Sequence, residues 1–260
     1  MSNPLDFSGR AVLVTGGSRG IGRGIAEAFL SAGADVAVCG RKEPDELPSA
    51  NGKAALFLSA DVRDAEQVER LVDGVVERFG RLDVLINNAG GAPFADAATA
   101  SPRFSEKVIQ LNLIAALHCA QQANRVMQTQ EEGGSIVNVA SVSGVRPSPG
   151  TAAYGAAKAG LINLSGTLAI EWAPKVRVNA ISAGLIQTEQ AHLHYGDDEG
   201  IARVADTVPL KRLGTPSDVA GACLFFASPL AAYVSGANLA LHGGGETPSF
   251  LSAASVNRGE

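Results

Sequence analysis

The chain has 260 residues, 46% of them hydrophobic and 18% charged, and its formal net charge at pH 7 is -5. These values exclude an extensively disordered chain and suit one large globular domain with its own core. The acidic balance, with no run of Lys or Arg, excludes a general attraction to nucleic-acid phosphates. No apolar stretch reaches the roughly 18 residues of a membrane span, so we expect no membrane partner either.

Short apolar runs alternate with amphipathic patterns along the chain. The runs predict strands at residues 11–15, 35–39, 54–59, 82–86, 135–140, 176–181 and 238–241. The amphipathic patterns predict helices at residues 20–32, 64–79, 105–130 and 151–172, and one more that begins after Thr215. Strands that alternate with helices imply right-handed crossovers, so we expect an α/β fold with a doubly wound parallel sheet and helices on both faces. Residues 1–260 should form one domain, with residues 246–260 as a flexible tail.

A glycine-rich turn separates the first predicted strand from the first predicted helix. Its residues are Thr15, Gly16, Gly17, Ser18, Arg19, Gly20, Ile21 and Gly22. Where side chains are missing, backbone N–H groups and the helix N-terminus can approach a pyrophosphate. The alternative is a turn whose glycines serve only close packing.

Tyr154 and Lys158 lie four residues apart in a predicted helix, so their phenol and ammonium groups share one face. A nearby positive charge stabilises the phenolate and lowers the pKa of the tyrosine. The tyrosine then donates and accepts a proton nearer to neutral pH. The alternative is a pair of ordinary surface neighbours.

These motifs stand in the order typical of the short-chain dehydrogenase/reductase family, which the chain resembles from about residue 6 to residue 245. The glycine turn is similar to the family's TGxxxGxG segment. Residues 87–90, Asn-Asn-Ala-Gly, are similar to the segment that stabilises the sheet beside the cofactor. Asn112 corresponds to the asparagine that supports an ordered water, and Ser141 precedes Tyr154 at the usual separation. The resemblance implies a Rossmann fold and an oxidoreductase.

The resemblance also implies a role for each of four catalytic residues. Ser141 hydrogen-bonds the substrate oxygen, and Tyr154 transfers its proton. Lys158 binds the nicotinamide ribose and lowers the tyrosine pKa, while Asn112 links the proton relay to solvent. The expected reaction is hydride transfer between nicotinamide and a carbonyl or secondary-alcohol carbon of a small to medium-sized, partly apolar substrate.

Two other functions remain open at this stage. The first is a reductase or dehydrogenase of 3-oxoacyl thioesters, carried by CoA or a carrier protein. The second is a sensor that binds NADP(H) without turnover, because function lies in the site and not in the fold. An enoyl reductase is disfavoured, because that branch of the family separates its tyrosine and lysine more widely than Tyr154 and Lys158.

The choice of cofactor depends on the end of the second strand, where Arg41 follows Gly40 and no acid is present to hold a free ribose 2′-hydroxyl. Arg41 offers a guanidinium fork for a 2′-phosphate, and Arg19 is similar to a second basic residue of many NADP-using members. We therefore expect NADP rather than NAD, unless both arginines are ordinary solvated charges. Besides Tyr154 and Lys158, the resemblance implies cofactor contacts at Gly16, Ser18, Arg19, Gly20, Ile21, Gly22, Arg41, Asp61, Val62, Asn88, Ala89, Gly90, Gly184, Ile186 and Thr188.

Two positions depart from the family pattern: Ala183 stands where many members have proline, and His242 stands where relatives commonly have aspartate. The substrate pocket should form after Gly90 and at residues 142–150 and 185–209, outside the carboxyl ends of the strands. Residues 185–209 should close over the substrate, or else form permanently ordered helix. Candidate wall residues are Pro93, Phe94, Arg146, Leu185, His192, His194 and Tyr195.

The cysteines at positions 39, 119 and 223 lie far apart and lack the spacing of a zinc site. We therefore expect reduced thiols, no bound metal and a cytoplasmic location. The first residues show no long apolar signal sequence. The family resemblance implies a small carbonyl or alcohol substrate as partner and a homo-oligomer, either a tetramer or a dimer.

Overall fold

Seven parallel strands form the main sheet in the computed structural model, which describes residues 3–249. Their order is β5-β2-β1-β6-β7-β8-β9, so the chain starts near the centre and winds outward in both directions. This order confirms the doubly wound parallel sheet. The strands are β1 (Ala11–Thr15), β2 (Asp35–Gly40), β5 (Leu56–Ser59), β6 (Val84–Asn87), β7 (Gly134–Ser141), β8 (Val176–Ala183) and β9 (Asn238–Leu241). A separate antiparallel pair consists of β3 (Ser49–Ala50) and β4 (Lys53–Ala54).

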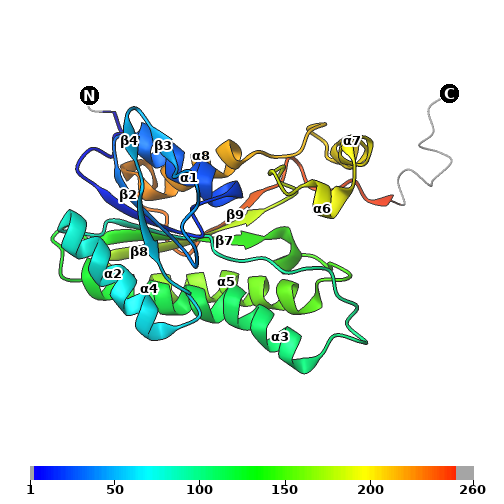
Figure 1. Cartoon of the computed structure of the whole chain (residues 1–260), viewed down its shortest axis with the longest axis horizontal. Helices are drawn as coiled ribbons and strands as arrows, with labels where there is room; N and C mark the ends of the chain where they lie inside the picture. Colours follow the sequence, from blue (N-terminus) through cyan, green and yellow to red (C-terminus); the bar gives the residue numbers. More distant parts are fainter. Residues whose placement is uncertain (1–2, 250–260) are drawn as a thin grey trace.

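Helices cover both faces of the sheet, as Figure 1 shows, with α1 and α8 on one face and α2, α4 and α5 on the other. Across residues 3–249 the α-helices are α1 (Gly20–Ser31), α2 (Ala65–Phe79), α3 (Pro102–Ile109), α4 (Ala115–Met127), α5 (Ala152–Glu171), α6 (His192–Tyr195), α7 (Asp198–Thr207) and α8 (Pro216–Ala227). Three shorter turns are η1 (Gln110–Ile114), η2 (Val142–Gly144) and η3 (Pro229–Ala231). None of the helices in this part of the chain is long and apolar enough to cross a membrane.

Alternate residues of the central strand β1 enter different cores. Val12 and Val14 pack on the face that also buries Phe29 of α1. Leu13 packs on the other face with Leu71 of α2. Because successive side chains point to opposite faces and both faces are covered, residues 11–14 of the strand are all apolar, and only Thr15 at its end is polar.

The helix predicted over residues 105–130 starts earlier and is not uniform. α3 begins at Pro102, and the Ser101 side chain accepts a hydrogen bond from the backbone N–H of Phe104 at 3.2 Å. Between α3 and α4 the five residues of η1 form a π-helical turn. A π turn changes the phase of a helix without breaking its hydrogen bonding, so the apolar pattern alone did not show it.

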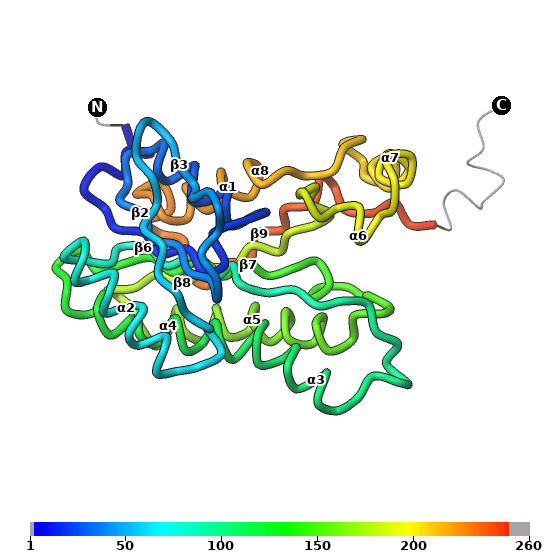
Figure 2. Tube along the Cα trace, in the orientation of Figure 1, coloured from blue at the N-terminus to red at the C-terminus, as the bar shows by residue number. Residues whose placement is uncertain are grey.

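Residues 185–209 contain the helices α6 and α7 and lie beyond the carboxyl end of β8 (Figure 1). Asp197 caps α7 by accepting a hydrogen bond from Gly200 N at 2.9 Å. This agrees with the alternative of ordered helix, while closure over a substrate stays a prediction. In Figure 2 the trace after β9 runs beside the connection from α7 to α8, where Leu210 N donates to Gly243 O at 3.1 Å. Of the expected tail, residues 250–260 lie outside the described residues.

Candidate active site

The glycine turn between β1 and α1 is tied to the segment that follows β6. Thr15 Oγ1 accepts hydrogen bonds from the backbone N–H groups of Asn88 and Ala89, both at 3.0 Å. The Asn88 side-chain amide donates in turn to the carbonyls of Thr15 and Gly16, at 3.0 and 3.2 Å. The structure therefore brings together two of the motifs that the sequence predicts to hold a cofactor.

The backbone of this turn requires glycine. Gly16 and Gly20 have φ values of 63° and 54°, in the left-handed region that side chains disfavour. A Cβ atom at Gly22 would lie only 2.3 Å from the carbonyl oxygen of Gly16. The first N–H groups of α1 have no partner within the helix, and a helix N-terminus with such donors suits the oxygens of a pyrophosphate.

A carboxylate that the sequence reasoning missed reaches this turn. Glu189 Oε1 accepts a hydrogen bond from Gly20 N at 3.0 Å, across 169 residues of chain. The methyl group of the neighbouring Thr188 lies 3.6 Å from the position that a Cβ would take at Gly20. Thr188 and Gly20 were both predicted to contact the cofactor, and they lie together. Nothing in the spacing of Glu189 signals its contact, because it depends on how the chain after β8 folds back.

Tyr154 and Lys158 share one face of α5, as their spacing predicts. Lys158 Nζ lies 5.6 Å from the centroid of the Tyr154 ring and donates a hydrogen bond to Val139 O at 2.8 Å. Lys158 is only 3% exposed, and burial lowers the pKa of its ammonium to about 8. A buried amine with a lowered pKa is typical of a functional site and rules out a surface pair.

Burial raises the pKa of Tyr154, and a side-chain hydrogen bond with Ser141 partly opposes that rise. The spacing argument predicted a lowered tyrosine pKa, but in the protein chain alone burial has the larger effect. Ser141 ends β7 and pairs with Ala183 at the end of β8. Its Oγ also accepts a hydrogen bond from Ser143 N at 3.2 Å. The serine and the tyrosine are therefore in direct contact at the carboxyl edge of the sheet.

Asn112 lies in the π-helical turn η1, and its side chain is fully engaged with backbone groups. Its Oδ1 accepts from Gly91 N at 2.8 Å, and its Nδ2 donates to the carbonyls of Gly91 and Val108 at 3.0 and 2.9 Å. A Cβ at Gly90 would lie 2.6 Å from Asn112 Oδ1 and 3.3 Å from Lys158 Nζ. The structure thus gathers two of the predicted site residues, Asn112 and Lys158, around a third, Gly90. π turns of this kind recur at functional sites.

The residues predicted for the adenine end lie around the ends of β2 and β5. Arg41 and Arg19 are both exposed, whereas Val62 is buried. The pKa of Asp61 is lowered first by the side-chain hydrogen bond from Arg63, at 2.9 Å from Arg63 Nε, and to a smaller extent by the charge of Arg41. The ion pair of Asp61 with Arg63 was not predicted. Ser18 lies 3.8 Å from the Cβ position at Gly40, which places the glycine turn beside the end of β2.

A cavity of about 220 Å³ lies beyond the carboxyl ends of β7 and β8, lined by Val142, Val145, Arg146, Gly184, Leu185, Val208, His242, Gly245 and Glu246. Arg146 forms an ion pair with Glu246 across the cavity's lining. A second cavity of about 270 Å³ shares Leu185, Val208 and His242 with the first and also contains Ile186. Leu185 and Arg146 therefore line a cavity, and their contact with the substrate stays a prediction.

The other wall candidates do not line these two cavities. Phe94 is 79% exposed and packs against Gly150, and His192 and His194 are exposed. His242 was recorded only as a departure from the family pattern, yet it lines both cavities. Its Nδ1 is buried and has no hydrogen-bond partner within residues 3–249.

Comparison with known proteins shows which family of proteins the chain resembles. The sequence model of a family described as Enoyl-(Acyl carrier protein) reductase matches residues 16–246. An L-rhamnose 1-dehydrogenase (NAD(P)(+)) of Azotobacter vinelandii is 38% identical, with 90% of this chain and 96% of that protein covered. A 3-oxoacyl-(acyl-carrier-protein) reductase of Synechocystis is 34% identical, with coverage of 92% and 97%. The ligand-free aldohexose dehydrogenase of Thermoplasma acidophilum has a TM-score of 0.84 at 30% identity, with coverage of 92% and 94%.

A doubly wound parallel sheet with a glycine turn, and with a tyrosine beside a buried lysine at its carboxyl edge, defines an oxidoreductase of the Rossmann type. The matches over nearly the whole length narrow this class: the chain belongs to the short-chain dehydrogenase/reductase family. Enzymes of this family use NAD(P) cofactors and act on small molecules.

Proposed function

We propose that the chain is an NADP(H)-dependent oxidoreductase that transfers a hydride between nicotinamide and a carbonyl or secondary-alcohol carbon. One observation carries the proposal: Ser141, Tyr154 and Lys158 meet at the carboxyl edge of the sheet, with Lys158 buried beside Gly90 and Asn112. A buried ammonium within 5.6 Å of a half-buried phenol costs stability and is typical of a functional site. A non-catalytic sensor could use Lys158 to bind a ribose, but it has no need of the Tyr154 phenol and Ser141 beside it.

Each residue of the group has a separate task in this proposal. Tyr154 gives its proton to the substrate oxygen during reduction and takes it back during oxidation. Ser141 already hydrogen-bonds the phenol and would hold the same substrate oxygen. Lys158 stabilises the phenolate and binds the nicotinamide ribose, and Asn112 holds the backbone at Gly91 and links the relay to solvent. When bound, the nicotinamide supplies or accepts the hydride.

The residues at the glycine turn fit a dinucleotide. The turn has no side chain at Gly16, Gly20 or Gly22, and its Gly20 N–H already donates to one carboxylate oxygen. We assign the pyrophosphate to this turn and to Thr188, and the nicotinamide to the space bounded by Gly90, Gly184 and Ile186. The exposed Arg41 and Arg19 support NADP over NAD, because guanidinium groups bind a 2′-phosphate and the residue directly after β2 is Arg41 and not an acid. Asp61, Val62, Asn88 and Ala89 complete the cofactor contacts that we propose.

The proposed substrate is small to medium-sized and partly apolar. The cavity of about 220 Å³ beyond the carboxyl ends of β7 and β8 is at the small end for ligand pockets, and four of its residues, Val142, Val145, Leu185 and Val208, are aliphatic. Arg146, Glu246 and His242 add polar groups to the lining. A 3-oxoacyl thioester is the second candidate, because a reductase of such thioesters is 34% identical over nearly the whole chain. Only the acyl end of a thioester would have to enter the cavity.

A substrate panel tests the proposal. The purified protein is assayed with NADPH and with NADH against aliphatic ketones, sugars, a 3-oxoacyl-CoA and a trans-2-enoyl-CoA, and in reverse with the matching alcohols. Reduction of carbonyl compounds with NADPH preferred supports the proposal, and the highest kcat/KM for the 3-oxoacyl-CoA would select the second candidate. Turnover of the enoyl compound alone, or of none of them despite NADPH binding, would contradict it.

We also assign a single domain to residues 1–260 and a homo-oligomeric state, a tetramer or a dimer. Ile170, Leu230 and Tyr233 are at least half exposed, and exposed large apolar side chains favour a protein partner. The three cysteines are buried free thiols, which supports a reducing compartment such as the cytoplasm. Light scattering during size-exclusion chromatography measures the assembly, and a monomer at all concentrations would contradict it.

A further inference from the structure

The hydrogen bond from Gly20 N to Glu189 is unusual for the start of a helix. Gly20 is the first residue of α1, and Arg19, the residue in front of it, makes no side-chain capping bond. Helix N-termini normally receive their acceptor from a residue next to them in sequence. Here the acceptor is a carboxylate 169 residues away, on the segment that follows β8.

We propose that Glu189 is a built-in competitor of the cofactor's pyrophosphate. In the free protein its carboxylate accepts from the Gly20 N–H, and dinucleotide binding displaces it and releases the segment that carries it. This inference rests on the proposed function, since it takes the glycine turn as the pyrophosphate site. It assigns to Glu189 control of cofactor affinity and a link between cofactor binding and residues 188–195.

Electrostatics explains why the two anions exclude each other. The N-terminus of α1 carries a partial positive charge that stabilises one nearby anion, and its free N–H groups hydrogen-bond that anion strongly. A carboxylate and a pyrophosphate at the same turn repel each other at short range. The pyrophosphate has more charge and more acceptor oxygens, so it takes the turn. Glu189 is exposed and regains water as its partner when it leaves.

The local chain geometry lets the carboxylate leave without unfolding the site. Gln187 N donates to Gly214 O at 2.8 Å, which fixes the chain just before the contact. After the contact, Ala191 N donates only to Thr188 O within the same turn, and α6 follows. Glu189 therefore connects the glycine turn to the segment that leads into α6. Gln187 stays hydrogen-bonded to Gly214 and holds the start of that segment in place.

The first test measures affinity. Glu189→Gln keeps the size of the side chain and an acceptor oxygen but removes the charge, and Glu199→Gln makes the same change on α7, where Glu199 pairs with Arg203. Calorimetric titration should give a Kd for NADP⁺ that is about threefold lower in Glu189→Gln, the size of a charge effect at a helix terminus. The Kd of Glu199→Gln should equal that of the wild type. Adenosine 2′-monophosphate, which has no pyrophosphate, should bind all three proteins equally.

The second test follows the contact itself and does not depend on turnover. In the free protein, Glu189→Ala should raise hydrogen exchange at Gly20 and in residues 188–195. With saturating NADP⁺ the exchange of the variant and the wild type should become equal, because the contact is then absent from both. Weaker binding by Glu189→Gln, or a difference in exchange that persists with NADP⁺, would overturn the inference.

The two tests separate this inference from the proposed function. A wild type that binds neither NADP⁺ nor NAD⁺ would contradict both. Binding without turnover of any substrate would contradict the proposed function alone. Inorganic pyrophosphate serves as an independent probe of the turn, and it should also bind Glu189→Gln more tightly than the wild type.

Discussion

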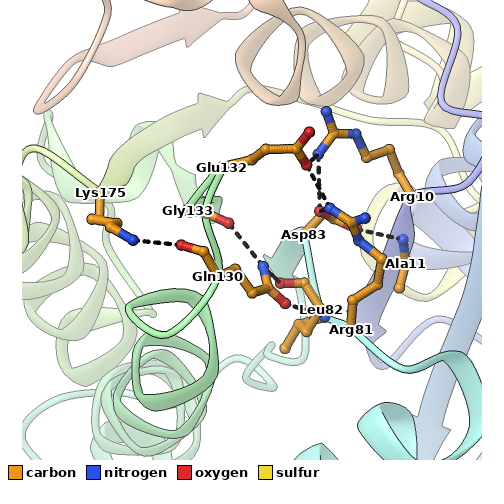
Figure 3. Close-up of polar contacts among 9 residues, drawn as sticks. All are labelled: Arg10, Ala11, Arg81, Leu82, Asp83, Gln130, Glu132, Gly133 and Lys175. Atoms are coloured by element: carbon orange, nitrogen blue, oxygen red, sulfur yellow. Dashed lines mark hydrogen bonds and ion pairs between the residues drawn. The ribbon is translucent and has the colours of Figure 1, made fainter.

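The buried charges at the two edges of the parallel sheet are compensated in opposite ways. At the amino edge, charged side chains are paired with one another in a closed network (Figure 3). At the carboxyl edge, a charged amine is buried without a carboxylate partner within residues 3–249. Pairing stabilises a fold, whereas an uncompensated buried charge is costly and is typical of a site with a chemical task.

Asp83 is the centre of the network at the amino edge. It is only 5% exposed and accepts hydrogen bonds from Ala11 N at 2.8 Å, from Arg81 Nε and Nη2 at 2.8 and 2.6 Å, and from Arg10 Nη1 at 3.1 Å. Arg10 and Arg81 also bind Glu132, and the side-chain hydrogen bond from Arg81 lowers the pKa of that glutamate. The network joins the starts of β1, β6 and β7.

Gln130 extends this network to the neighbouring strand. Its Oε1 accepts from Leu82 N at 2.9 Å, and its Nε2 donates to the carbonyls of Leu82 and Gly133 at 3.0 and 2.9 Å. Lys175, the residue that precedes β8 in the chain, donates to the backbone carbonyl of Gln130 at 2.6 Å. Figure 3 shows these contacts converging between the strand ends. The amino edge is therefore a fixed support, and the exchangeable contacts of the molecule lie at the other edge.

The largest expected effect belongs to the carboxyl edge. Tyr154→Phe removes the transferable proton and keeps the ring, so kcat should fall about a thousandfold. The Kd for NADPH, measured by fluorescence titration, should stay unchanged, because the ring packing and Lys158 remain. A kcat within a few-fold of the wild type would remove Tyr154 from the proposed chemistry.

The amino edge should respond in stability and not in activity. Asp83→Ala leaves Arg10 and Arg81 with Glu132 alone and the Ala11 N–H without an acceptor. The free energy of unfolding should fall by about 3 kcal/mol, the cost of breaking a buried ion pair. Denaturant titration measures this loss, while kcat of the folded variant should stay within about twofold of the wild type. A large drop in kcat at full folding would show that the two edges are coupled.

Lys158→Met should abolish most activity and yet stabilise the fold. Burial lowers the pKa of Lys158 from 10.5 to about 8, so the charge opposes folding. Each pKa unit corresponds to about 1.4 kcal/mol, and after the lost bond to Val139 O we expect a gain of about 2 kcal/mol at pH 7.

The pH dependence of that gain has a definite sign. Below pH 8 both the folded and the unfolded lysine are protonated, and the full cost of burial is present. As pH rises from about 8 to 10.5, the folded lysine is neutral while the unfolded one still binds a proton, so the cost decreases. Thermal unfolding of both proteins across this range should show the gain of Lys158→Met shrinking. A gain that is constant with pH would contradict a buried ammonium.

The smallest expected effect concerns cofactor choice. Arg41→Asp replaces a cation that suits a 2′-phosphate with an acid that suits a ribose hydroxyl. The ratio of kcat/KM with NADPH to that with NADH should fall by about tenfold, the value of one charge-assisted contact, mainly through KM. Arg63→Ala is the control variant, because it removes a different cation and breaks that residue's ion pair with Asp61. Equal use of both cofactors by the wild type would refute the role of Arg41.

The sequence predicted the sheet because its signals are local. Strand β1 was predicted with its observed bounds, since a strand buried on both faces reads as a continuous apolar run that ends at a turn. The edge strand β9 was also predicted with its observed bounds, although three of its four residues are exposed. The spacing of Tyr154 and Lys158 placed both groups on one helix face for the same reason. The π-helical turn at Asn112 was missed, because one shifted hydrogen-bond register leaves the apolar pattern nearly unchanged.

Contacts between segments that lie far apart along the chain could not be predicted from the sequence. Glu189 reaches Gly20, and Arg146 pairs with Glu246, only because the chain after β8 and the chain after β9 return to the same edge. The direction of the Tyr154 pKa also depends on burial, which helix spacing does not reveal. Wall residues such as Phe94 were misplaced for a related reason: a loop's path decides whether an apolar side chain faces the cavity or solvent.

The central claim is that the carboxyl edge transfers a hydride between nicotinamide and carbon. NADPH carrying deuterium at the transferable position of the nicotinamide is incubated with the wild type, Tyr154→Phe and Asp83→Ala, together with the ketone that the panel selects. Mass spectrometry should find one deuterium on the carbinol carbon of the product for the wild type and for Asp83→Ala. Tyr154→Phe should yield almost no labelled product in the same time. Product without deuterium from the wild type, or equal labelling by all three proteins, would contradict the account.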